Sequence, residues 1–108
     1  MKTESEYYIL SAKHTQKREP YLTWWGADCR GYTWFKSRMG VYSEGEAKEI
    51  ATNQDNYMVP KILVDNYFIK DISEGREGFA IPNLPIVLKA LGFKTVRANR
   101  SGVFIQAI

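Results

Sequence analysis

Tyr7-Tyr8-Ile9-Leu10-Ser11-Ala12 is a short run of aromatic and aliphatic residues, and this composition predicts a β-strand. Successive side chains on a strand point to opposite faces, so Tyr8 and Leu10 would face one way and Tyr7 and Ile9 the other. Both pairs are apolar. We therefore expect this strand to lie in the centre of a sheet.

Further strands follow this stretch. A polar loop is expected over residues 13–20, and glycines at both ends of residues 26–31 can reverse the chain between two aromatic strands. Residues 74–78 predict a turn, and residues 99–102 predict the turn of a terminal hairpin. The expected strands cover residues 21–25, 32–37, 79–81, 95–98 and 103–108.

The clearest local signal is a capping box at the start of a helix. Ser43 and Glu46 have the spacing in which the Ser hydroxyl accepts a hydrogen bond from the amide of Glu46, while the Glu carboxylate accepts one from the amide of Ser43. Tyr42 can pack onto Ala47 as a hydrophobic staple. The helix is expected from about residue 44 to residue 53.

Two more helices are expected further along the chain. Pro60 suits the first turn of one helix, although the same segment also fits a hairpin that turns at residues 65–66. Asn83 can cap another helix, which would end near Gly92. The apolar stripe of the helix that begins near Pro60 would consist of Leu63, Val64, Tyr67 and Phe68.

These elements predict a single α+β domain over residues 1–108, with a mostly antiparallel sheet and two or three helices packed on one face. A chain of 108 residues buries roughly two-thirds of its accessible area on folding. One Cys and one His are too few for a structural zinc site or a disulfide framework. The first ten residues do not resemble a secretion signal, and no apolar run reaches the roughly 20 residues of a membrane span, so we expect a cytoplasmic protein without a membrane partner.

Aromatic residues are concentrated between residues 24 and 42. Because Trp24 and Trp25 are adjacent on an expected strand, they must point to opposite faces, and helices on one face would leave at least one indole on the open face. There it could stack on a base, a ligand or a partner side chain. The alternatives are that both faces are covered, or that cross-strand aromatic pairs stabilise the hairpin.

Positively charged residues flank and interrupt these rings. The net charge is +3 over residues 1–42, −4 over 43–75 and +4 over 76–108, a distribution that is also typical of a mixed solvated surface. Cations that hold phosphate, interleaved with rings that hold bases, suit a single-stranded nucleic acid or a nucleotide. The candidate binding residues are Lys13, Trp24, Trp25, Arg30, Tyr32, Trp34, Lys36 and Arg38.

No catalytic residue, metal ligand or cofactor is expected. Cys29 has only His14 as a possible base, and a reduced surface Cys is the ordinary interpretation of such a residue. The glycines do not open a βαβ unit with a phosphate-cradling loop. We therefore expect a protein that is not an enzyme.

Six short motifs are spread over about the first 85 residues. They are Tyr7-Tyr8-Ile9-Leu10-Ser11-x-Lys13-His14-Thr15, Trp24-Trp25-Gly26, Gly31-Tyr32-Thr33-Trp34, Gly40-x-Tyr42-Ser43-Glu44, Val59-Pro60 and Ile81-Pro82-Asn83. Together they resemble a family of small uncharacterised proteins encoded by bacteriophages and prophages. The resemblance implies an intracellular, phage-related setting, in which small proteins bind host machinery that includes antiviral defence complexes, and it transfers no catalytic residue.

The leading hypothesis is a non-enzymatic, anti-CRISPR-like binding protein of phage origin. It would inhibit or redirect a bacterial host protein or nucleoprotein complex through its aromatic-basic face. One alternative is a small-molecule or nucleotide binder that acts as a sponge for a signal. A second alternative is a single-stranded nucleic-acid-binding module.

Overall fold

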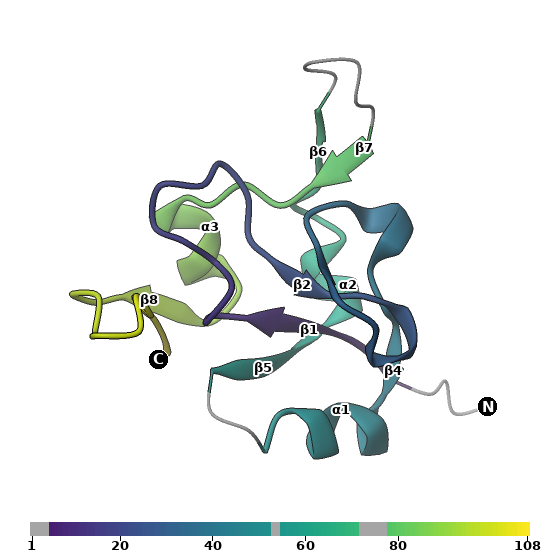
Figure 1. The fold of residues 1–108 in the computed structure, drawn as a ribbon. Coiled ribbons are helices and arrows are strands. Elements are labelled where there is room, and N and C mark those ends of the chain that lie inside the picture. The colour runs from purple at the N-terminus through teal and green to yellow at the C-terminus, as the bar shows by residue number, and fades with distance from the viewer. Residues whose placement is uncertain (1–4, 53–54, 72–77) are drawn as a thin grey trace.

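The computed structural model describes residues 5–52, 55–71 and 78–108. Strand β1 (Glu6–Ser11) lies in the centre of the main sheet, and its neighbours run antiparallel to it (Figure 1). Along one edge it pairs with β5 (Asn56–Pro60). Its other edge is shared by β4 (Tyr42–Ser43) and β2 (Trp24–Trp25), and β2 pairs with β3 (Tyr32–Thr33) to form the expected hairpin. The central position predicted for the first strand is confirmed.

Two small antiparallel sheets accompany the main one. β6 (Ile69–Asp71) pairs with β7 (Gly78–Ala80), close to the short strand expected at 79–81. β8 (Phe93–Thr95) pairs with β9 (Ile105–Ala107) and forms the predicted terminal hairpin. Residues 74–77 of the turn predicted at 74–78 lie outside the described residues.

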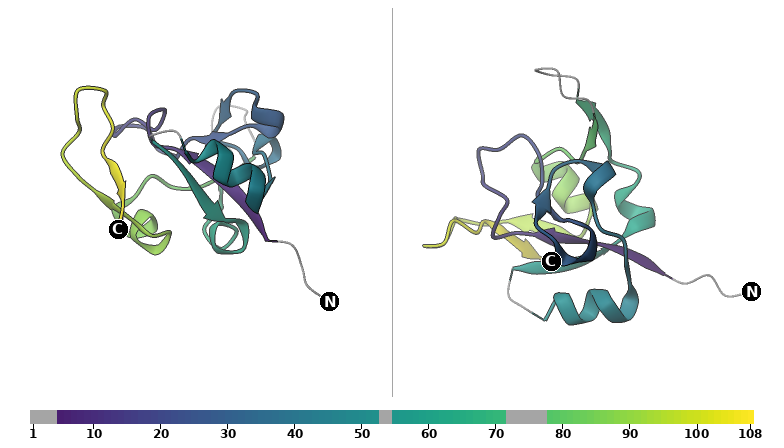
Figure 2. Two further views of the ribbon diagram at one scale, coloured as in Figure 1. Left: turned by 90° about the horizontal axis from the view of Figure 1, so that it is seen from below. Right: turned by 45° about the vertical axis from the view of Figure 1, so that its right-hand side comes forward.

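Apolar side chains from both faces of β1 are buried. Tyr8 and Leu10 belong to the larger core, together with residues of helices α2 (Lys61–Val64) and α3 (Pro85–Ala90). Ile9 faces the other way and packs with Ala47 of helix α1 (Glu44–Ile50). Figure 2 shows α1 on one side of β1, with α2 and α3 on the other. The α+β class is confirmed. The helices are divided between the two faces of the sheet, and this division decides how far the tryptophans are buried.

Helix α1 begins as its sequence predicts. The amide of Glu46 donates to Ser43 Oγ at 3.3 Å, and the amide of Ser43 donates to Glu46 Oε1 at 3.1 Å. The same bonds lower the pKa of the Glu46 carboxyl, because they favour its charged form. Tyr42 and Ala47 share the smaller core, as a staple requires. The helix ends at Ile50, three residues before the expected end.

The segment after Pro60 contains a helix of one turn rather than a long one. The helix α2 ends at Val64, and the chain reaches β6 at Ile69. The helical alternative is therefore the correct one, but the helix is too short to carry the whole apolar stripe predicted for it. The predicted apolar stripe still packs on the larger core, where Val64 is buried and the partly buried members are Leu63, Tyr67 and Phe68.

Other elements differ from expectation because tertiary contacts compete with local preferences. The strand expected at 32–37 ends at Thr33, since Lys36–Arg38 forms a 3-10 turn. Only Trp24–Trp25 of the strand expected at 21–25 is paired as a strand. Helix α3 is preceded by Leu84 rather than by an Asn83 cap. The side-chain amide of Asn83 instead donates to the carbonyls of Gln16 and Glu19, at 3.1 and 3.0 Å, and so anchors the 13–20 loop.

Candidate functional site

The two adjacent tryptophans face opposite sides of the sheet, but neither indole ring is fully exposed to solvent. Trp24 is 0% exposed and lies in the larger core, edge-on to Tyr8 at 6.1 Å between ring centroids. Trp25 is half-buried against the smaller core, and its Nε1 donates to Asn56 Oδ1 at 3.1 Å. The prediction that Trp24 contacts a partner is therefore wrong, because helices cover both faces of the sheet.

Three of the predicted binding residues lie together at the edge formed by β3. Tyr32, Trp34 and Arg38 line a shallow hollow of about 300 Å³ with Thr23, Thr33 and Phe35. Tyr32 is 47% exposed. Trp34 is half-buried, and its Nε1 donates to Thr23 Oγ1 at 3.2 Å, so this indole also stabilises the fold.

Lys36 belongs to a different environment. Its Nζ lies 3.9 Å from Asp65 Oδ1 and 4.9 Å from the centroid of the Phe68 ring. Asp65 also accepts hydrogen bonds from Lys61 Nζ at 2.8 Å and from the Tyr8 hydroxyl at 2.9 Å. Burial alone would raise the pKa of the Asp65 carboxyl, but the bonds from Lys61 and Tyr8 outweigh it and hold that pKa below its usual range. Lys36 therefore has an intramolecular partner.

The tight loop at residues 26–31 places Arg30 and the start of β3. Asp28 and Cys29 both have left-handed backbones, with φ of 57° and 58°, a conformation that residues with a Cβ seldom adopt. The Tyr42 hydroxyl holds this loop from inside: it donates to the carbonyl of Gly26 and accepts from the amide of Cys29 at 3.0 Å. Burial raises the pKa of Tyr42. Arg30 itself is exposed.

A ladder of aromatic rings connects the smaller core to the surface. Trp25 lies edge-on to Tyr32 at 5.8 Å between centroids. His14 stacks on Tyr32 at 3.8 Å with an interplanar angle of 21°. The Nδ1 of His14 lies 2.9 Å from Ser11 Oγ, which fixes the orientation of the imidazole. We call Trp25, Tyr32 and His14 the aromatic ladder; its outer ring, His14, is exposed.

A basic hollow of about 360 Å³ is lined in part by Lys13, the residue before His14. It lies between the 13–20 loop and the turn of the terminal hairpin, and Figure 2 shows these two segments close together at one end of the molecule. No acidic residue is among the described residues that line it. The lining residues are Lys13, Gln16, Lys17, Arg18, Ala98, Ser101 and Gly102.

Both walls of the basic hollow are held by specific hydrogen bonds. On the loop side, Thr15 Oγ1 donates to the carbonyl of Ser11 at 2.8 Å and accepts from the amide of Thr23 at 3.0 Å. On the hairpin side, Asn99 Oδ1 accepts from the amides of Ser101 and Val103 at 2.9 and 3.0 Å. These bonds fix the backbone from which the cations project.

The structure thus places the predicted binding residues in several separate environments rather than in one site. Lys13 lies in the basic hollow, with the aromatic ladder beginning at the next residue. Lys17 and Arg18 were visible as part of a basic segment, but the contribution of the terminal hairpin was not predicted. Arg97 and Arg100 are exposed on that hairpin. The positive net charge of residues 76–108 was the only sequence signal for it.

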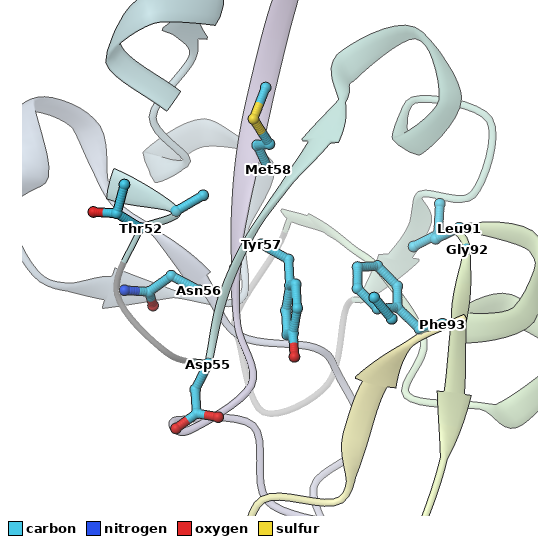
Figure 3. A pocket seen from close by; sticks show the side chains of 10 residues that line it. Thr52, Asp55, Asn56, Tyr57, Met58, Leu91, Gly92 and Phe93 are labelled. Carbon is cyan, nitrogen blue, oxygen red and sulfur yellow. The ribbon is translucent and has the colours of Figure 1, made fainter. Parts of the chain in front are cut away.

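A third hollow has a different character. It measures about 600 Å³ and lies between β5 and the start of β8, where the rings of Tyr57 and Phe93 meet at 5.1 Å (Figure 3). None of the ten described residues that line it carries a positive charge, and Asp55 contributes a carboxylate. This lining is poorly suited to the phosphates of a nucleotide.

No known protein family, curated protein or solved structure matches the chain. Within the part of the chain that the structure describes, no three His, Cys, Asp or Glu side chains are grouped to hold a metal ion. Among the same residues, no helix has the length and apolar character that a membrane crossing would require.

Proposed function

We propose that this chain is a non-enzymatic binding protein that acts in the cytoplasm of a bacterial host cell. It docks onto an acidic or phosphate-bearing surface of a host protein or nucleoprotein complex and inhibits or redirects that complex. The observation that carries the proposal is the junction of the basic hollow with the aromatic ladder: Lys13 lines the hollow, and His14 stacks on Tyr32.

The electrostatics of the hollow support binding to an anionic surface. Lys13, Lys17 and Arg18 take part in none of the ion pairs found among the described residues, whereas Lys36 and Lys61 both face Asp65. Like charges held close together without a counter-charge repel one another, and an anionic partner relieves that repulsion. Complementary charge also increases the association rate and favours correct partners.

The bacterial setting of the proposal comes from the sequence. The motifs between Tyr7 and Asn83 resemble those of small phage-encoded proteins. Two of them contribute Lys13, His14 and Tyr32, the residues at which the hollow and the ladder meet. The residues at this junction therefore lie within the motifs that carry the resemblance.

A capture experiment with paired charge reversals tests this function. The tagged full chain is incubated with bacterial lysate, in parallel with Arg18→Glu in the basic hollow and Lys48→Glu on α1. We expect the wild type and Lys48→Glu to recover the same defined complex and Arg18→Glu to lose it. If Arg18→Glu recovers the complex undiminished, or if native mass spectrometry finds a retained nucleotide and no complex, the proposal is wrong.

A further inference from the structure

We propose that the basic hollow binds the phosphodiester backbone of a single-stranded nucleic acid and that His14 provides the first stacking surface for its bases. This inference rests on the proposed function and names the chemical class that the same surface recognises. It predicts the nucleic-acid part of a nucleoprotein complex as the direct contact.

The charge of the basic hollow is complementary to that of a phosphate backbone. Lys13, Lys17 and Arg18 converge on one hollow that has no carboxylate among its described lining residues. Its far wall includes Ala98, Ser101 and Gly102 of the terminal hairpin, and Arg97 and Arg100 of the same hairpin are exposed. Several cations grouped at one hollow follow a strand of negative charges more closely than a single surface cation does.

The second step is the position of the rings. Tyr32 covers one face of the His14 imidazole at 3.8 Å, and His14 is an exposed residue, so its other face is left for a base. Lys13, the residue before His14, lines the hollow, and phosphate and base contacts would therefore be adjacent. Bases in a duplex are stacked on one another, whereas single strands present them to protein rings.

The third step separates a nucleic acid from an acidic protein. An acidic peptide would satisfy the cations through its carboxylates, whereas a nucleic acid carries a planar base beside each phosphate and so suits the cations and the imidazole together. The rings of Trp25, Tyr32 and His14 contact one another in series, and a 2.9 Å contact links His14 to Ser11, so the outer ring is oriented before any ligand arrives. Such a fixed platform reduces the ordering cost of stacking.

The expected salt dependence follows from the number of cations. Contacts from Lys13, Lys17 and Arg18 to about three phosphates give a slope of about −2 in a plot of log binding constant against log salt concentration for a single strand. The dissociation constant should therefore rise about 18-fold between 50 and 200 mM salt. Loss of one contact should reduce the slope by about 0.7 and the affinity at 50 mM salt by about eightfold.

The test is a fluorescence-anisotropy titration of the full chain with a ten-residue oligothymidylate and with an abasic phosphodiester strand of equal length. Lys17→Gln should weaken binding to both strands about eightfold at 50 mM salt, and the matched control Lys48→Gln on α1 should leave both unchanged. His14→Ala should weaken binding to the oligothymidylate about tenfold and leave the abasic strand unaffected. Thermal unfolding of each variant confirms that the fold is intact.

Several outcomes would overturn the inference. It is wrong if no oligonucleotide binds at 50 mM salt, if a duplex of the same length binds as well as the single strand, or if polyglutamate competes as well as the oligothymidylate. Capture from untreated lysate then separates the two proposals. If the captured complex depends on Arg18 but no oligonucleotide binds, the proposed function stands and this inference is wrong. If an oligonucleotide binds but no complex is captured, the binding to nucleic acid stands and the proposed function is wrong.

Discussion

The two hydrogen bonds of the Tyr42 hydroxyl should stabilise this fold by more than the same two bonds would on an exposed surface. It holds the loop that contains Asp28 and Cys29, two consecutive left-handed residues whose conformations cost on the order of 1–2 kcal/mol each. The bond to the Gly26 carbonyl is buried, and the bond from the Cys29 amide is partly buried. Tyr42→Phe keeps the ring and removes both bonds.

The size of the effect follows from what the substitution leaves behind. The Gly26 carbonyl stays buried without its donor, which costs about 1–3 kcal/mol, and the Cys29 amide is close enough to solvent to find water. We expect the free energy of unfolding to fall by about 2 kcal/mol and the Tm to fall by about 10 °C. Urea unfolding followed by tryptophan fluorescence measures the first, and an unchanged slope with urea shows that the same two states are compared.

Tyr7→Phe is the matched control for this substitution. Tyr7 pairs with Tyr42 across β1 and β4 and packs against the same smaller core, and no hydrogen bond to its hydroxyl was found among the described residues. Its removal should change the free energy of unfolding by less than about 0.5 kcal/mol. If Tyr42→Phe behaves like Tyr7→Phe, the loop keeps its shape without the phenol, and our account of how Tyr32 is positioned is wrong.

Two further predictions concern the ion-pair network and the helix cap. The pKa of Asp65 is lower in the folded state than in the unfolded chain because of Lys61 and Tyr8, so its contribution is complete above the ordinary carboxyl pKa of about 3.9 and is lost as the pH falls through the folded-state value. Asp65→Asn should flatten that part of the acid-side stability curve, measured by urea unfolding from pH 7 to pH 3; an unchanged curve would contradict the assignment. Ser43→Ala should cost about 1 kcal/mol through the lost bond to Glu46, and full stability by the same assay would contradict the cap.

The local part of the fold was readable from the sequence. The alternation from Tyr7 to Leu10 predicted which side chains share a face, and the two cores contain those sets. The spacing of Ser43 and Glu46 predicted the start of α1. Both signals depend on residues within four positions of each other, so no distant contact could overrule them easily.

The errors arose where distant segments compete. Asn83 has the composition of a helix cap, but its amide forms two bonds to a loop more than 60 residues earlier in the chain. The alternation rule was right for Trp24 and Trp25, yet the conclusion drawn from it was not, because α1 covers the face that was expected to be open. Which faces are covered is decided by how helices dock, and that is a property of the whole chain.

The same coverage explains why folding leaves cations, rather than indoles, available for a partner. Folding satisfies the indoles: Trp24 enters the larger core, and Trp25 and Trp34 donate to Asn56 and Thr23. It does not satisfy the charges of the basic hollow, because the loop and the terminal hairpin that bring them together supply no acid to its lining. Hydrogen bonds of Thr15 and Asn99 fix the loop that carries these cations and the hairpin that faces it. Positive charge held in place beside an exposed ring is the feature that internal packing leaves unexplained and that binding to an anionic partner would explain.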